Sequence, residues 1–414
     1  MSRLVEALLP ARLGVGFRWL LGSSWLTNLG DGIVLAAGPL LVASMTDDAR
    51  LVALGATLQW LPPLLFGLLA GALSDRRDRH RLVVAMNLVR AFVLAVLATA
   101  VITDQVTIAV VLGALFLLGT TEVFVDNTTS TLLPMLVHRD DLPVANSRLQ
   151  AAFITVNQLA GPPLGAALFA AGAAFPFFSE AVLVVAGALL VTRLRLPAHA
   201  QERAHSHLGR DIVEGVRFAL RQPAVRTLIL TIFTFNITYG AAWSVLVLYA
   251  TRRLGMGEVG FGLLTTVSAA GGLLATTTYG WITRHVTMAD LMRIGLVLET
   301  LTHVALALTT RPWVAMTIMF VFGAHAFVWG TTSMTIRQRV VPLRLQGRVN
   351  SVNLIGSFGG LVVGSLLGGS LAEHWGVTAP FWFAAAGSAV FVVAIWRQLR
   401  HIAVADASPV VDEG

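Results

Sequence analysis

The sequence predicts an all-α protein that crosses a membrane with twelve helices, and three observations lead to this fold class. The 414 residues are 56% hydrophobic and 12% charged, whereas a soluble domain carries about 25% charged residues. Apolar stretches of helical-span length recur along the whole chain, and short arginine-rich segments separate them. Together these features exclude a soluble monomer.

Each apolar stretch is long enough for a transmembrane helix, because about 20 apolar residues cross a hydrocarbon core about 30 Å thick. We bounded the stretches at charged residues, glycine and proline. The first is longer than the apolar region of a signal peptide and lacks a cleavage pattern, so we expect no cleavable signal. The twelve predicted spans are residues 17–44, 51–73, 82–103, 106–136, 147–171, 174–195, 225–250, 259–283, 288–309, 313–336, 347–372 and 377–397.

The arginines predict the orientation of these spans. All 29 basic residues are arginine, and four of them fall at loops after odd-numbered spans, namely Arg50, Arg252, Arg253 and Arg311. The other 25, among which we count Arg90, fall at the termini or near loops after even-numbered spans. Because cytoplasmic loops carry an excess of basic residues, we expect both termini in the cytoplasm.

A polar segment divides the chain into two halves. Residues 196–224 combine charged and polar residues with apolar residues at helical spacing, which favours a cytoplasmic linker with an amphipathic helix. We therefore expect an N-terminal six-helix half at 1–195 and a C-terminal six-helix half at 225–402. The acidic, proline-containing tail at 403–414 is typical of disorder.

The two halves contain a weak internal repeat. The segment Gly-Pro-Pro-Leu-Gly-Ala-Ala-Leu from Gly161 aligns with Gly-Ser-Leu-Leu-Gly-Gly-Ser-Leu from Gly364 at an offset of 203 residues. The pair Asn-Ser at Asn146 aligns with Asn-Ser at Asn350 at an offset of 204. Two parallel repeats of six spans are the architecture of major facilitator transporters.

The loop after the second span carries the most specific motif. From Gly71 the chain reads Gly-Ala-Leu-Ser-Asp-Arg-Arg-Asp-Arg-His-Arg-Leu, which resembles the major facilitator signature Gly-x-Leu-x-Asp-Arg-x-Gly-Arg-Lys. The chain departs from it with Asp and His in place of the second Gly and the Lys. The resemblance implies a gate loop, in which glycine permits close helix packing, aspartate caps a neighbouring helix and arginines bind acidic or carbonyl groups. A plain basic loop that only sets orientation is the alternative. The gate-loop residues are Gly71, Asp75, Arg76 and Arg79.

The fifth span contains Gly-Pro-Pro-Leu-Gly, which resembles the signature of antiporters in this superfamily. Gly161 and Gly165 would permit close packing, and Pro162 would bend the helix so that it moves against its neighbours without leaking ions. A kink without functional meaning is the alternative. Residues 28–43 and 337–351 resemble the macrolide-efflux and siderophore-exporter branch of bacterial drug/proton antiporters.

Few ionisable residues fall inside the spans, where a charge costs at least about 2.5 kcal/mol without a partner. Asp31 lies near the middle of the first span, and Glu122 and Asp126 share a face of the fourth. We predict that these carboxylates couple transport to protons. The alternatives are a structural role for Asp31 and an ion pair of Asp126 with the basic loop. The fourth span has no embedded arginine, so a coupling scheme that uses one there does not apply.

The resemblance places spans one, four, seven and ten around a central substrate cavity. Aromatic surface and a histidine that titrates near neutral pH suit a bulky lipophilic substrate, whereas a hydrogen-bonded core histidine is the alternative. Glu180, Glu299 and His303 fall on spans six and nine, and we expect them to be structural. The predicted cavity residues are Asn28, Asn236, Tyr239, Trp243, His325 and Trp329.

These patterns predict secondary active efflux of a lipophilic, drug-like or macrolide-like molecule across the bacterial cytoplasmic membrane by proton antiport and alternating access. An exporter of an endogenous metabolite such as a siderophore, and a lysophospholipid flippase, are the alternatives. Without lysine the chain has no nucleotide-binding loop of a primary pump, and without cysteine it has no thiolate site. We expect no enzyme activity, metal or cofactor beyond the proton gradient. The expected partners are the substrate, protons and membrane lipids. We expect no nucleic acid despite the net charge of +7, and we expect a monomer.

Overall fold

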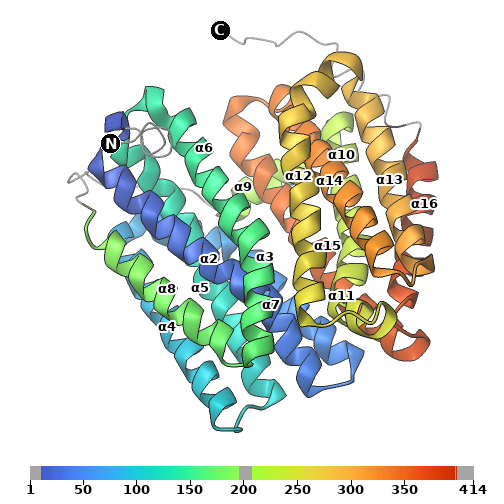
Figure 1. Cartoon of the computed structure of the whole chain (residues 1–414). Helices are drawn as coiled ribbons and strands as arrows, with labels where there is room; N and C mark the ends of the chain where they lie inside the picture. The colour runs from blue at the N-terminus through green and yellow to red at the C-terminus, as the bar shows by residue number, and fades with distance from the viewer. Residues whose placement is uncertain (1–10, 195–207, 397, 399–414) are drawn as a thin grey trace. The chain divides into compact units, whose positions relative to one another are not determined.

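The computed structural model describes residues 11–194, 208–396 and 398, and within these residues the ordered elements are helices without any β-strand. Figure 1 shows them in chain order. This confirms the predicted all-α fold class. The predicted tail at 403–414, and residues 196–207 of the predicted linker, lie outside the described residues.

The first six predicted spans coincide with helices. Residues 142–171 form one continuous helical stretch built from three elements, and the last helix has 17 residues. The elements are η1 (Ala11–Leu13), α2 (Gly14–Met45), α3 (Ala49–Arg76), α4 (Arg79–Ile102), α5 (Ile108–Leu136), η2 (Arg139–Asp141), α6 (Leu142–Ala152), η3 (Phe153–Ala160), α7 (Gly161–Ala171) and α8 (Phe175–Val191).

The last six predicted spans coincide with helices as well. Before them, a helix occupies the place of the predicted amphipathic segment. The elements are α9 (Leu208–Arg221), α10 (Pro223–Trp243), α11 (Leu246–Leu248), η4 (Tyr249–Arg253), α12 (Glu258–His285), α13 (Met288–Leu308), α14 (Pro312–Val340), α15 (Leu343–Trp375) and α16 (Ala379–Ile395). Nine of the described helices are long and apolar enough to cross a membrane, and α8 and α16 are shorter apolar helices.

Polar side chains begin several helices. Asp78 precedes α4, and its side chain accepts a hydrogen bond from the Arg81 amide. Thr107 accepts one from the Val110 amide of α5, and Thr287 accepts one from the Asp290 amide of α13. These caps satisfy amide groups that have no partner within the first turn. In the fifth span the turn before Pro162 is a π-helix, η3. Proline supplies no amide hydrogen to the preceding turn, which permits this change of hydrogen bonding.

The chain forms two units of packed helices. Of the described residues, the first unit holds 11–47, 58–194 and 257–266, and the second holds 48–57, 208–256 and 267–396. The beginning of α3 thus packs with the second unit, and the beginning of α12 with the first. The boundaries of the two halves predicted from the sequence, at residues 195 and 225, do not include these two places where part of a helix packs with the other unit.

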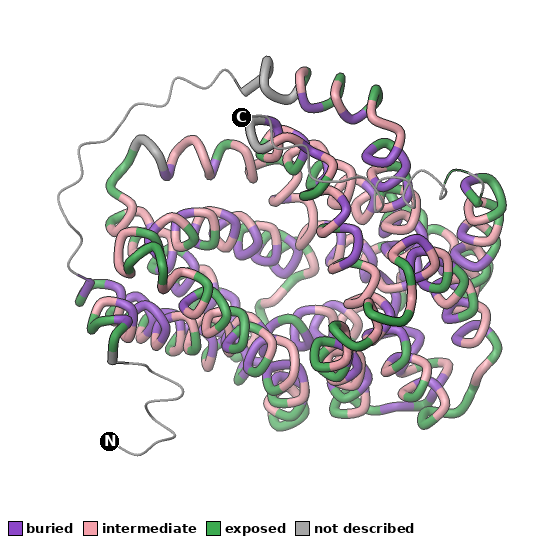
Figure 2. The backbone as a smooth tube through the Cα atoms, turned by 90° about the horizontal axis from the view of Figure 1, so that it is seen from above, coloured by how far each residue is buried: buried purple, intermediate pink, exposed green. Residues whose placement is uncertain are grey.

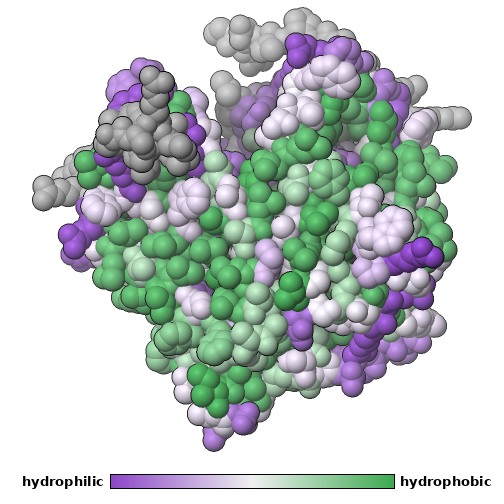
Figure 3. Space-filling model, in the orientation of Figure 1, coloured by the Kyte–Doolittle hydropathy of each residue, from purple (hydrophilic) through white to green (hydrophobic). Residues whose placement is uncertain are grey.

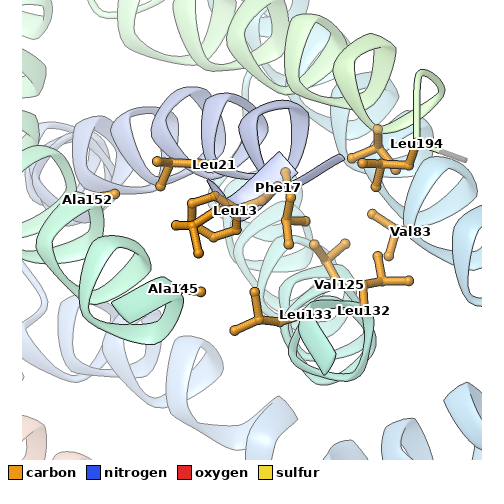
Figure 4. Close-up of a cluster of buried hydrophobic side chains, with 12 residues drawn as sticks. Leu13, Phe17, Leu21, Val83, Val125, Leu132, Leu133, Ala145, Ala152 and Leu194 are labelled. Atoms are coloured by element: carbon orange, nitrogen blue, oxygen red, sulfur yellow. The ribbon is translucent and has the colours of Figure 1, made fainter. Parts of the chain in front are cut away.

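A cluster of buried apolar side chains holds one end of the first unit together. Figure 4 shows these side chains converging from η1, α2, α4, α5 and α6. Phe17 and Leu132 are fully buried within the cluster. Its labelled members are Leu13, Phe17, Leu21, Val83, Val125, Leu132, Leu133, Ala145, Ala152 and Leu194.

The repeated glycines make the same kind of contact in both units. A Cβ on Gly165 would lie 2.1 Å from the Ile33 carbonyl oxygen of α2. A Cβ on Gly368, its counterpart at an offset of 203, would lie 2.1 Å from the Ala241 carbonyl oxygen of α10. Only glycine permits such an approach of two helix backbones. The internal repeat in the sequence therefore corresponds to a repeated helix contact.

Large apolar side chains cover much of the exposed helix surface. Phe92, Val390 and Val393 are each at least 70% exposed. Figure 2 shows buried and exposed positions alternating along the helices, and Figure 3 shows hydrophobic residues over much of the visible face. Such a surface suits a lipid environment, because lipid tails impose no cost on exposed apolar groups.

Candidate functional site

Arg90 lies at the centre of a buried charged cluster in the first unit. Its guanidinium donates hydrogen bonds to Asp31 of α2 and Glu180 of α8 through the same nitrogen, Nη2. The side chains of Arg90 and Glu180 are 4% and 0% exposed, and that of Asp31 is 12% exposed. Three helices that are distant in sequence thus meet at one ionic contact.

Small residues around Asp31 create room for this cluster. A Cβ on Gly30 would lie 2.8 Å from Glu180 Cγ, and a Cβ on Gly32 would lie 2.3 Å from the Asn157 carbonyl oxygen in η3. Side chains at these two positions would push α8 and η3 away from α2. The glycines on both sides of Asp31 therefore bring its partners close.

The carboxylates of α5 lie next to the same cluster. The charges of Asp31 and Arg90 act on both Glu122 and Asp126. Glu122 is half-buried and Asp126 is exposed. Asp126 is therefore the most exposed of these groups, Glu122 and Asp31 are both half-buried, and Arg90 is buried in the interior of the first unit.

The cluster corrects one expectation from the sequence. Arg90 is counted with a basic loop in the sequence, but it lies eleven residues after Arg79, the first residue of α4, and is buried. Glu180, which the sequence leaves as structural, contacts the same Arg90 nitrogen as Asp31. The first unit therefore contains an embedded arginine, on the third span rather than the fourth. The position of Arg90 in the middle of an apolar stretch is the sequence feature that indicates its burial.

The predicted antiporter-type helix packs directly beside Asp31. Gly161 faces the Gly32 backbone, where a Cβ would come within 2.5 Å, and Gly165 faces Ile33. Pro162 is buried. These residues lie in the close contact that fixes the position of α2.

The predicted gate loop is described in part. The side chains of Asp75 and Arg76 lie outside the described residues. A Cβ on Gly71 would meet no heavy atom of the described residues within 4 Å, so the close helix packing predicted at this glycine is not found among them. Arg79 donates hydrogen bonds to the Ser74 carbonyl oxygen at the end of α3, at 3.3 Å, and to Met135 Sδ of α5, at 3.2 Å.

A cavity of about 310 Å³ lies within the second unit, between α10, α13 and α14. Four predicted cavity residues line it, namely Asn236, Tyr239, His325 and Trp329. Trp243 stacks on Tyr239 with ring centroids 4.4 Å apart, so it supports the wall. Asn28 belongs to the first unit and donates hydrogen bonds to Ser24 of its own helix. A volume of this size accommodates a small organic molecule.

Glu299 lies between two histidines at this cavity. His303 Nε2 is 3.2 Å from Oε1, and His325 Nε2 is 3.0 Å from Oε2. All three residues are at most 9% exposed. Glu299 was expected to be structural on a peripheral span, but it lines the cavity. His325 is thus neither alone nor bonded only to the backbone, because a carboxylate on the neighbouring helix faces it.

No set of three or more histidine, aspartate or glutamate side chains has the arrangement of a metal site in the described part of the chain. The buried charged clusters of the two units contain different basic residues. Arginine and carboxylates meet in the first unit, and a carboxylate and histidines meet in the second.

Comparison with known proteins identifies what the chain is similar to. A family described as transmembrane secretion effector matches residues 6–411. The multidrug efflux pump Tap of Mycolicibacterium fortuitum is 30% identical over 375 residues, which cover 85% of this chain and 88% of the pump.

Solved structures show the same fold. The nucleoside transporter NupG superposes with a TM-score of 0.73 at 13% identity, covering 94% of this chain and 100% of that one. A bacterial homologue of the human lysosomal transporter Spinster, in an inward-facing and unoccupied conformation, has a TM-score of 0.72 at 14% identity. It covers 97% of this chain and 99% of that one.

Proposed function

Because the chain belongs to the transmembrane secretion effector family of the major facilitator superfamily, we propose that this multi-pass membrane transporter exports a lipophilic small molecule in exchange for protons. The similarity to a multidrug efflux pump supports a drug-like or macrolide-like substrate and the bacterial cytoplasmic membrane as its location. We propose that the proton gradient alone drives the transport, that the protein acts as a monomer, and that both termini are cytoplasmic.

The contact of Arg90 with both Asp31 and Glu180 is the observation that carries the proton-exchange proposal. Two ionised carboxylates beside one guanidinium leave one excess negative charge in a buried place. An unpaired buried charge is costly, and a proton bound to one carboxylate removes it. The cluster is thus suited to hold one exchangeable proton.

The arrangement also supports a path for the proton and a movement of α2 when the proton binds. A proton would pass from exposed Asp126 through half-buried Glu122 to Asp31. Its arrival weakens the attraction between α2 and Arg90 of α4. Because α2 packs tightly against η3 and α7 through Gly32 and Gly165, a shift of α2 moves the fifth span with it. Proton binding and helix movement are thereby linked.

The experiment uses full-length protein in liposomes with a panel of labelled lipophilic compounds, erythromycin first. Asp31→Asn and Glu122→Gln replace a carboxylate by a neutral group of nearly the same size, as protonation does. We expect each variant to exchange labelled compound across the membrane at a rate near wild type. An imposed pH difference should drive accumulation by wild-type protein and not by the variants.

Asp104→Asn is the matched control, because Asp104 is an exposed carboxylate in the α4–α5 loop. It should accumulate the compound as wild type does. Accumulation at the wild-type level by the Asp31→Asn/Glu122→Gln double variant would place the proton site elsewhere and overturn the proposal.

A further inference from the structure

We propose that the cavity in the second unit binds an amphipathic organic cation, with Glu299 as its counter-ion, and that protonation of His303 or His325 releases the cation. The inference rests on the proposed function only in taking this cation as an exported substrate. The site itself follows from the charges and aromatic rings around the cavity.

The walls of the cavity suit a cation without its water shell. Tyr239 and Phe322 are nearly parallel, with an interplanar angle of 13° and centroids 5.8 Å apart, and Trp329 and Phe235 also line the space. Aromatic faces attract cations, most strongly where water is excluded. The wall includes Glu299 as its carboxylate and no arginine, and the sequence has no lysine.

Glu299 lacks the permanent counter-ion that the first unit provides for its own carboxylates. Arg90 lies eleven residues after Arg79 in α4, and Glu299 lies eleven residues after Met288 in α13. Equivalent depths in the third and ninth spans thus carry opposite charges. In the first unit a fixed arginine compensates Asp31 and Glu180. In the second unit a bound cation would compensate Glu299.

The groups that face Glu299 determine how pH acts on the site. α13 contributes His303, α14 contributes His325 and α10 contributes Tyr239, whereas α16, which packs on α13, contains no ionisable residue. The other charged residues of α13, Asp290 and Arg293, form an ion pair at its first turn. With neutral histidines the site carries one negative charge, and acidification cancels it. Cation affinity should therefore fall as pH falls.

Among the described residues, Trp329 Nε1 is a buried polar atom at the cavity that has no hydrogen-bond partner. An indole nitrogen can only donate a hydrogen bond. A ligand that carries an acceptor oxygen near its cationic group would satisfy Trp329 while its charge faces Glu299.

The test compares two probes of almost equal shape, methyltriphenylphosphonium and triphenylphosphine oxide, of which only the first is charged. Equilibrium binding to purified full-length protein in detergent is measured at pH 8 and pH 5.5. We expect the phosphonium to bind at least about tenfold more tightly at pH 8. Binding of the neutral oxide should change less than about twofold between the two pH values.

Variants assign the effect to residues. Glu299→Gln should weaken phosphonium binding at least about tenfold at pH 8, and Glu299→Asp, which keeps the charge, should retain most of it. The His303→Gln/His325→Gln double variant should bind the phosphonium with little dependence on pH. Glu258→Gln is the matched control, because Glu258 is exposed at the start of α12 and lies outside the cavity. Thermal melting of each variant reports its folding.

Wild-type affinity in a folded Glu299→Gln variant would overturn the proposal, as would equal binding of the phosphonium by wild type at both pH values. If Glu299→Gln does not fold, the pH dependence of the double histidine variant decides, and a dependence like that of wild type overturns the proposal. Binding in detergent needs no gradient, so this result is independent of whether transport is coupled to protons.

Discussion

Gly165 of α7 lies against the Ile33 carbonyl oxygen of α2, so closely that a Cβ would come within 2.1 Å of it. This contact is two residues along α2 from Asp31. The packing of the fifth span against α2 therefore also influences the position of the charged cluster. This packing depends on glycine at residue 165.

We predict that Gly165→Val destabilises the protein by about 1–3 kcal/mol, because overpacking forces two helix backbones apart. Gly113→Val is the control, since a side chain on Gly113 meets no atom within 4 Å and the change in helix propensity is the same. Thermal melting in detergent measures both. Equal melting temperatures for the two variants would contradict the packing argument.

Replacing Arg90 by leucine should cost about 3–5 kcal/mol at pH 8, because Asp31 and Glu180 remain buried without a cation. Acidification protonates these carboxylates and removes their repulsion. We therefore expect the melting temperature of Arg90→Leu to recover toward wild type as pH falls from 8 to 5.

The control for this prediction is Arg284→Leu, because Arg284 is exposed at the end of α12. Its melting temperature should differ little from wild type at either pH. An Arg90→Leu variant whose deficit is the same at both pH values would show that lost packing, not unpaired charge, causes the destabilisation.

A disulfide should form between cysteines at positions 57 and 365. Thr57 Oγ1 of α3 and Ser365 Oγ of α15 are 2.6 Å apart, and the native chain has no cysteine that would react instead. Oxidised Thr57→Cys/Ser365→Cys protein should migrate as a cross-linked species, and reduction should reverse this change. Each single variant serves as control. Migration of the oxidised double variant like that of the single variants would contradict the contact.

Asp78 stands where the superfamily signature has glycine, and its side chain accepts the Arg81 amide at 3.0 Å. We predict that Asp78→Ala lowers the free energy of unfolding by about 1 kcal/mol, as loss of a helix cap does, while Asp78→Asn retains most of it. Thermal melting distinguishes the two. Identical melting of both variants and wild type would remove the capping role.

The positions of the spans follow from the sequence because a chain in lipid must pair its backbone groups internally, which makes long apolar stretches helical. Tyr239, His325 and Trp329 were predicted to face a cavity because their spans occupy inner positions in the related fold. The pairs that define the charged sites were not predictable in this way. Arg90 and Glu180 are 90 residues apart, and nothing in their local sequence states that α4 and α8 meet.

An arginine in such a chain can indicate either of two structural situations. Near a loop it indicates orientation, and inside a span it requires a buried partner. The sequence pattern assigns Arg90 to a loop, whereas the structure places it inside a span with buried partners. His325 and Glu299 illustrate the same limit, because their contact joins α14 to α13 and depends on how these helices are rotated about their axes.

The π-helical segment η3 explains a one-residue mismatch between the two halves. The offset between matching residues is 204 at Asn146 and 203 at Gly161, so the first half holds one extra residue between these landmarks. That interval contains η3, whereas the matching interval of α15 is α-helical throughout. The extra residue is thus absorbed within the π-helical segment, which leaves Gly161 and Gly165 in the same phase as Gly364 and Gly368. Deleting one residue of η3 would make the interval from Asn146 to Gly161 as long as the interval from Asn350 to Gly364.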